Sequence, residues 1–203
     1  MRRAQAQSRG GDSIVEADRQ ALRELIAGVM PGRENALVFG EGPAGARLML
    51  IGEAPGEQES LLGRPFVGKA GRNLDRFLEL AGMRREELYI TNTVKLRPTK
   101  TGRSGRLSNR PPTREEVVLF LPWLLREIRE VEPRAIATLG NTPLQALAGR
   151  GATIGRLHGQ WVDAADGLRI FALYHPASLI YNRALESVYE EDVRALARAV
   201  GTD

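Results

Sequence analysis

The chain has 203 residues, 42% of them hydrophobic, and a formal net charge of +4. A chain of this size can bury one substantial hydrophobic core, so we expect a single folded domain. It contains no cysteine, which excludes disulfides, thiolate-bound zinc and cysteine-ligated iron–sulfur clusters. No metal is predicted either, because there are only two histidines and the carboxylates do not cluster at ligand spacing. No apolar run is long enough to cross a bilayer, and we expect a cytoplasmic protein without a membrane anchor.

Hydrophobic periodicity predicts helices and strands that alternate along the chain. Residues 1–12 are polar and predict a disordered tail, ahead of a folded domain over residues 13–203. The spacing of apolar residues predicts helices over 13–27, 70–81, 113–133, 141–149 and 185–200. Runs rich in apolar, β-branched and aromatic residues predict strands over 47–52, 87–94, 134–140 and 168–173. Thr113 is the expected N-cap of the helix over 113–133.

This alternation predicts an α/β fold. Strands that are almost wholly apolar are typical of a parallel sheet covered by helices on both faces. We therefore predict a three-layer α/β/α domain with a central four-stranded parallel sheet. Ligands of such folds collect at the carboxyl ends of the strands, which are the loops after Ile51, Val94, Leu139 and Leu173.

The loop after the first strand, GEAPGEQESLLGRPFVGKAGRNL over residues 52–74, is rich in glycine and proline. It lacks the lysine and hydroxyl residue of a P-loop and the GxGxxG spacing, so ordinary NTP or NAD binding is not expected. Glu53, at the strand end, could orient a water molecule, and Phe66 could offer an aromatic face to a planar ligand. A tight structural loop with Phe66 in the core is an equally open interpretation.

Asn92 lies near the end of the second strand, among apolar residues. Its side-chain amide has one acceptor and two donors, enough to read the edge of a nucleobase. An asparagine that ties two loops together is the structural alternative.

The segment from Tyr89 to Arg114 carries no acidic residue. Its basic residues are Lys95, Arg97, Lys100, Arg103, Arg106, Arg110 and Arg114. A run of one sign beside a strand end favours contacts with phosphates, and a disordered segment without a partner is the alternative.

His175 follows the last strand and precedes a proline, which places its ring at the carboxyl edge of the sheet. An apolar and aromatic segment, Leu179, Ile180 and Tyr181, comes next, followed by Arg183. An exposed apolar wedge beside a basic surface is how proteins pry into stacked bases. His158 lacks such neighbours and is interpreted as structural.

Four segments in this order and spacing, GEAPGE…GRPFVGKAG, YITNTVKLRP, PRAIATLG and HPASL, resemble the uracil-DNA glycosylase superfamily. The chain is most similar to family 4, from about Leu22 to the C-terminus. The resemblance implies a four-stranded parallel sheet between helices. It also implies a DNA repair enzyme that flips deoxyuridine out of single- or double-stranded DNA, hydrolyses its N-glycosidic bond and leaves an abasic site.

The resemblance also implies roles for individual residues. Phe66 resembles the aromatic on which uracil stacks, Asn92 the amide that pairs with its edge, and His175 the histidine that hydrogen-bonds O2. The water-activating motif corresponds to Gly52, Glu53, Ala54, Pro55 and Gly56, with Glu53 the first candidate to position water and Glu57 the second. Gly56 stands where some members place an aromatic against the C5 methyl of thymine. The basic residues Lys95 to Arg110 and Arg183 would hold phosphates, and the segment from Leu179 to Tyr181 would fill the vacated space.

One departure from family 4 is large, because its members typically hold an iron–sulfur cluster on four cysteines. Leu96 and Phe120 stand where two of those cysteines are expected, and the other two would fall in AGVMPGREN. Apolar replacements can fill the vacated volume, so we predict a cluster-free enzyme without any cofactor. A related branch with an insertion like that over 97–111 traps uracil through a loop histidine. No histidine occurs here, and trapping is not predicted.

Two other functions remain open at this stage. One is a glycosylase for another deaminated base, hypoxanthine or xanthine, and the other is a DNA-binding relative without activity. A small-molecule nucleotide hydrolase fits the basic segment poorly. A monomer is the default expectation.

Overall fold

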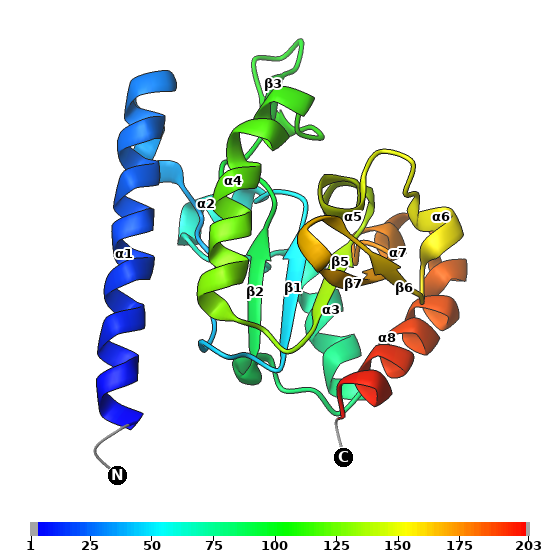
Figure 1. Ribbon diagram of the computed structural model, residues 1–203. Coiled ribbons are helices and arrows are strands. Elements are labelled where there is room, and N and C mark those ends of the chain that lie inside the picture. Colours follow the sequence, from blue (N-terminus) through cyan, green and yellow to red (C-terminus); the bar gives the residue numbers. More distant parts are fainter. Residues whose placement is uncertain (1–3, 202–203) are drawn as a thin grey trace.

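The structure, a computed structural model, describes residues 4–201, with side chains from residue 16 onward. Its centre is a five-stranded sheet in the order β2-β1-β5-β7-β6 (Figure 1). The strands are β1 Leu48–Gly52, β2 Leu88–Asn92, β5 Ile136–Leu139, β6 Trp161–Asp163 and β7 Arg169–Leu173. Strands β2, β1, β5 and β7 are mutually parallel, which confirms the predicted parallel sheet. Strand β6 adds an antiparallel edge that the sequence analysis missed.

The α-helices are α1 Ala4–Val29, α2 Glu57–Leu62, α3 Lys69–Leu80, α4 Arg114–Val131, α5 Asn141–Ala148, α6 Ile154–Leu157, α7 Ser178–Tyr181 and α8 Glu186–Val200. The five predicted helices correspond to α1, α3, α4, α5 and α8, whereas the short helices α2, α6 and α7 were not predicted. Helix α1 begins at Ala4 rather than at the predicted Ser13, and its first four residues, Ala4 to Gln7, are alanines and glutamines, which are good helix formers. Residues 1–3 of the predicted tail lie outside the described residues. Thr113 caps α4 as expected, accepting a hydrogen bond from the Glu116 backbone N–H.

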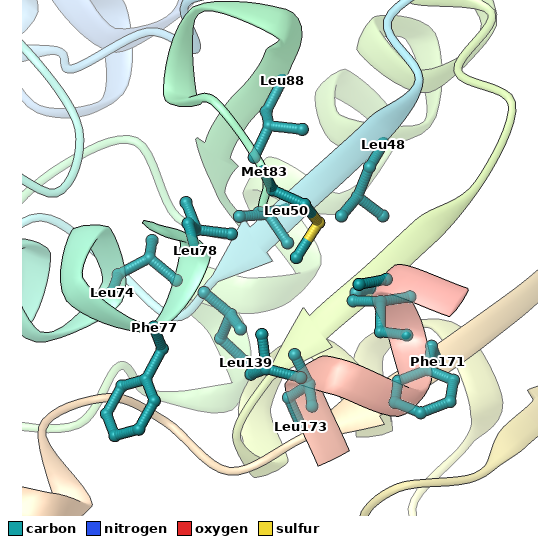
Figure 2. Packing of buried hydrophobic residues seen from close by; sticks show 14 of the residues in the cluster. Leu48, Leu50, Leu74, Phe77, Leu78, Met83, Leu88, Leu139, Phe171 and Leu173 are labelled. Atoms are coloured by element: carbon teal, nitrogen blue, oxygen red, sulfur yellow. The ribbon is translucent and has the colours of Figure 1, made fainter. Parts of the chain in front are cut away.

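Helices cover both faces of the sheet, because successive strand residues point to opposite sides. Leu48 and Leu50 of β1 face α3, where they pack with Leu74, Phe77 and Leu78 (Figure 2). The same cluster includes Val193 and Leu196 of α8. Met49 and Ile51 of the same strand face the other way, toward α4 and α5, where they pack against Leu124, Ile128, Leu144 and Leu147. The result is the predicted three-layer α/β/α domain.

A third group of buried apolar side chains lies outside these two layers and joins α1 to α4 and to the chain after β2. This α1–α4 cluster consists of Leu22, Ile26, Leu37, Val94, Leu96 and Phe120. Figure 1 shows α1 running alongside α4, away from the sheet. The cluster is therefore what attaches α1 to the rest of the domain.

The basic segment after β2 is folded. Strands β3 Thr99–Thr101 and β4 Leu107–Asn109 pair antiparallel, with Thr99 opposite Asn109. This hairpin projects beyond the N-terminal end of α4 (Figure 1).

No helix in the described part of the chain is both long enough and apolar enough to cross a membrane.

Candidate active site

The carboxyl ends of the parallel strands surround a cavity of about 470 Å³. Gly52 and Asn92 are register partners at the ends of β1 and β2, and His175 follows β7. The lining of the cavity includes Glu53, Ala54, Pro55, Gly56, Glu57, Phe66, Asn92, Asn109, Arg110, His175, Ile180 and Tyr181. The structure thus brings the predicted aromatic, amide and imidazole side chains to one place, which we call the site cavity.

Phe66 is held rigidly at the wall of the site cavity. Its φ of 53° lies in the left-handed region, which is unusual for a bulky residue. Arg85 stabilises this turn by donating to the backbone oxygens of Phe66 at 3.1 Å and Pro65 at 2.8 Å. A Cβ at Gly71 would lie 1.9 Å from the Phe66 oxygen, so only glycine lets the loop pack against α3. The Phe66 ring lies 5.9 Å from the His175 ring, centroid to centroid.

Gly52 leaves space for the side chains of Asn92 and Phe66 because it has no side chain of its own. A Cβ at this position would lie 2.4 Å from Asn92 Oδ1 and 2.5 Å from Phe66 Cζ. Any larger residue would therefore displace both the amide and the ring. Asn92 itself is only 3% exposed, so its amide faces the site cavity from a fixed, buried position.

The hydrogen bonding of His175 defines its tautomer. Its Nδ1 accepts a hydrogen bond from the Ala177 backbone N–H at 3.1 Å, so the ring proton lies on Nε2. Burial lowers the pKa of His175 to about 4, and the nearby Glu59 carboxylate opposes this only in part. The imidazole at the site cavity is therefore neutral near pH 7, with Nε2–H as its donor.

The lowered pKa of His175 predicts that the free energy of unfolding falls on acidification. The unfolded chain takes up this proton at about pH 6.5 and the folded protein only at about pH 4. Between these values the unfolded state binds more protons, so stability drops as the pH falls through this window, by up to about 3 kcal/mol. Urea unfolding from pH 8 to 4 should show a shallower decline below pH 7 for His175→Gln than for the wild type. Equal declines below pH 7 would contradict the prediction, and equal slopes between pH 7 and 8 are the internal control.

Glu59 is a site residue that the sequence analysis missed. It is buried, and its carboxylate accepts hydrogen bonds from the backbone N–H groups of Gly56 at 3.1 Å, Val67 at 3.0 Å and Gly68 at 2.7 Å. It therefore ties together the two halves of the loop that carries Phe66. A Cβ at Gly56 would lie 2.7 Å from Glu59 Oε2, which explains the glycine there. Glu59 is the third residue of α2 and its side chain binds the N–H of the N-cap Gly56, but a glycine at the N-cap does not give the capping-box signature that a sequence search would find.

Glu53 and Glu57, the two carboxylates predicted to position water, lie in different environments. Glu53 follows β1, and its Oε2 accepts a hydrogen bond of 2.5 Å from Thr142 Oγ1 at the start of α5. This contact orients the Glu53 carboxylate at the cavity wall. Glu57 lies at the exposed mouth, 3.4 Å from the Arg97 guanidinium. Of the two carboxylates, Glu53 is therefore the one with a fixed orientation at the site cavity.

The predicted basic surface is smaller than the sequence suggested. Lys100, Arg103 and Arg106 are exposed on the hairpin β3–β4, and Arg114 is exposed at the start of α4. Arg97 is partly buried, and its Nε donates at 2.7 Å to Oδ1 of Asn109, a residue that lines the site cavity.

Lys95 does not belong to this surface, and the prediction that it contacts phosphate is wrong. It is 2% exposed and forms an ion pair with Glu127 of α4. Arg110 is also committed within the protein, because two of its nitrogens donate to the Glu116 carboxylate, each at 2.7 Å. Arg110 therefore ties the hairpin to α4 rather than offering a free charge.

The apolar wedge also needs a correction. Leu179 is 7% exposed and packs in the core beneath α7, so it cannot enter DNA. Ile180 and Tyr181 are 44% and 88% exposed, because successive residues of a helix point in different directions. Both line the site cavity, and Arg183 is exposed just beyond them. The wedge therefore reduces to Ile180 and Tyr181.

Comparison with known proteins identifies the family. The model of the uracil DNA glycosylase superfamily matches residues 39–197. The chain belongs to the uracil-DNA glycosylase superfamily.

Its relatives include enzymes of two types. The type-4 uracil-DNA glycosylase of Saccharolobus solfataricus is 38% identical, over 84% of this chain and 78% of that protein. The type-4 enzyme of Thermotoga maritima is 34% identical, over 90% and 92%. A type-5 uracil-DNA glycosylase of Pyrobaculum aerophilum is 36% identical, over 78% and 74%. The crystal structure of Pedobacter heparinus SMUG2 covers 78% of this chain and 77% of its own with a TM-score of 0.53; at 16% identity it shows a shared fold alone.

The side chains at the positions where cluster-binding cysteines were expected cannot hold an iron–sulfur cluster. Leu96 and Phe120 are 3% and 0% exposed and pack together within the α1–α4 cluster, which provides no thiolate. No group of three or more possible metal ligands exists among the side chains that the structure describes, those of residues 16–201. The donor set therefore does not fit the cluster, and apolar contacts join the same segments instead.

Proposed function

We propose that this superfamily member is a DNA repair glycosylase that hydrolyses the N-glycosidic bond of deoxyuridine in DNA and leaves an abasic site. The observation that carries the proposal is the convergence of Phe66, Asn92 and His175 on one cavity of about 470 Å³. An aromatic face, a carboxamide and a neutral imidazole are the groups needed to stack against a uracil ring and bind its rim. The type-4 relatives support the same activity.

Recognition of uracil follows from the fixed amide of Asn92. The target nucleotide must leave the base stack, which costs a few kcal/mol in a duplex and less in a single strand. Once the base lies on Phe66, the Asn92 amide donates to O4 and accepts from N3–H. Cytosine presents an amine in place of O4 and no proton at N3, so buried polar groups would be left unpaired. This mismatch excludes cytosine.

Bond cleavage needs stabilisation of the leaving group more than a strong acid. The C1′–N1 bond breaks with its electron pair moving to uracil, which leaves as an anion, while the sugar acquires oxocarbenium character. The Nε2–H of His175 donates to O2, where negative charge grows, and keeps its proton because the ring is neutral. Glu53 orients a water molecule whose oxygen bonds to C1′. The proton that this water loses returns to solvent, and the uracil anion takes one up after release.

We propose that this chemistry needs no iron–sulfur cluster. The packing of Leu96 and Phe120 with Leu22, Ile26, Leu37 and Val94 supports this, because it links α1, α4 and the chain after β2 through apolar contacts alone. Val94 and Leu96 lie only a few residues beyond Asn92, so the apolar cluster also supports the amide-bearing end of β2.

A panel of oligonucleotides tests the proposed function. Single- and double-stranded oligonucleotides with uracil, hypoxanthine or xanthine at one position are incubated with the protein and cleaved with alkali at abasic sites. Strand breaks at uracil alone are expected. Breaks at hypoxanthine or xanthine without uracil would instead assign the chain to another deaminated base. Binding without breaks would indicate a relative without activity.

The hairpin β3–β4 should bind DNA through phosphates, without sequence preference. Arg103→Ser/Arg106→Ser should weaken binding to all sequences alike and reduce the slope of log K against log salt concentration by about 0.7–0.9 per lost phosphate contact. Fluorescence anisotropy over a salt series measures this slope.

The matched control is Arg84→Ser/Arg134→Ser, which removes the same charge. These exposed arginines precede β2 and β5, at the amino-terminal edge of the sheet, opposite the site cavity. A loss confined to some sequences, or an equal loss in the control variant, would refute the role of the hairpin.

A further inference from the structure

A buried ion pair lies directly behind Asn92. Lys95 Nζ donates to Thr91 Oγ1 at 2.6 Å, to the backbone oxygen of Asn92 at 2.8 Å and to the Glu127 carboxylate. These contacts use all three ammonium protons. Lys95 thus holds the carbonyl of the residue whose side chain faces the site cavity.

Glu127 connects this ammonium group to α4. Its carboxylate also accepts from Tyr89 Oη and from Thr91 Oγ1, each at 3.0 Å. A Cβ at Gly40 would lie 2.4 Å from Glu127 Oε1, so the chain passes here without a side chain and leaves room for the carboxylate. One carboxylate on α4 therefore binds two side chains of β2 and the lysine that follows it.

The buried ion pair of Lys95 and Glu127 is not explained by its contribution to the stability of the fold alone. Removing two charges from water carries a penalty that their attraction often only repays, and an apolar pair of similar volume is frequently as stable. Burial lowers the pKa of Lys95, with Glu127 opposing the effect, which shows the same penalty. An apolar pair could not hold the Asn92 carbonyl, however, because that oxygen needs a donor.

We propose that Lys95, oriented by Glu127 and Thr91, is the positioning residue for Asn92. By holding the Asn92 carbonyl it fixes the peptide plane at the end of β2, and with it the direction in which the amide enters the site cavity. Lys95 acts through Asn92 and does not touch the base. The inference rests on the proposed function, since it assigns Lys95 to the reading of uracil. Misplacement of a binding group by about 1 Å can cost about 10²-fold in rate, so the effect should be measurable.

A double-mutant cycle tests this coupling. Lys95→Met keeps an unbranched, flexible side chain only one atom shorter and removes its donors. Single-turnover release of uracil should fall by about tenfold for Lys95→Met in the wild-type background and again in the His175→Ala background. In the Asn92→Ala background the same change should cost less than about twofold, because no amide remains to be positioned. The loss should appear in the rate at saturating enzyme rather than in the affinity for DNA.

A role in stability alone predicts a different pattern. Lys95→Met would then reduce the rate by the same factor in all three backgrounds, or lower only the melting temperature, and either result would overturn the proposal. If Lys95→Met does not fold, Thr91→Val and Glu127→Gln take its place in the same cycle. They disturb the network while keeping the shape of their side chains, and they should show the same dependence on Asn92.

Uracil release by the wild-type protein distinguishes a failure of the proposed function from a failure of the positioning role of Lys95. If it releases no uracil, the proposed function fails and the positioning role falls with it. If it releases uracil and the losses at Lys95 and Asn92 multiply independently, only the positioning role is refuted.

Discussion

Asn92→Ala should lower the single-turnover rate of uracil release by about 10²–10³-fold, the usual cost of removing one preorganised hydrogen-bonding group from an active site. The amide is buried and faces the site cavity, so its loss leaves both O4 and N3–H of the flipped uracil without partners. Binding to uracil-free DNA should change little, because the exposed basic residues of the hairpin are untouched. Quenched-flow assays with a uracil oligonucleotide measure the first quantity, and fluorescence anisotropy measures the second.

Asn92→Asp is the matched control, because it keeps the size of the side chain and replaces the amide donor by an oxygen. An oxygen facing uracil O4 cannot replace that hydrogen bond, so the rate should stay low. If Asn92→Ala or Asn92→Asp released uracil at the wild-type rate, the assignment of Asn92 to base recognition would be refuted.

His175→Ala should lower the rate of uracil release by about 10²-fold, because it removes the Nε2–H donor from the position where negative charge grows on O2. The Ala177 N–H holds the ring so that this donor faces the site cavity, and Gly140 packs closely against it, with an added Cβ lying 3.1 Å from His175 Cβ. His175→Gln, whose side chain also donates an N–H, should recover part of the loss. A higher rate for His175→Gln than for His175→Ala would show that the N–H donor matters. Equal rates for the two variants would indicate that the imidazole contributes by packing alone.

The pH dependence of the wild-type rate gives an independent check on His175. Because burial lowers its pKa to about 4, the ring is already neutral at about pH 5 and stays neutral through pH 8. The rate should therefore show no ionisation attributable to His175 between these values. An acid limb near pH 6.5 that disappears in His175→Ala would contradict a neutral donor.

Much of the fold follows from local patterns. Apolar runs predicted the four parallel strands, and the spacing of apolar residues predicted the long helices, because each of these signals repeats within a few residues. Asn92 and His175 could be singled out because each lies at or just beyond the end of a predicted strand, and the carboxyl ends of parallel strands share one edge. Phe66 could be singled out as an aromatic residue in the glycine- and proline-rich loop that follows the first strand. Strand β6 was missed because an edge strand of three residues is too short to show a pattern.

The errors have a common physical cause, since each depends on a partner far along the chain. Lys95 is a buried positioning group rather than a surface charge because Glu127, 32 residues away, supplies the carboxylate that makes its burial possible. Leu179 is buried rather than exposed to DNA because it packs in the core cluster that contains Leu74 and Phe77 of α3, about 100 residues earlier in the chain. The sequence by itself determines whether a side chain is charged or apolar. Whether that side chain contacts solvent, substrate or another buried group depends on distant segments that come into contact only when the chain folds.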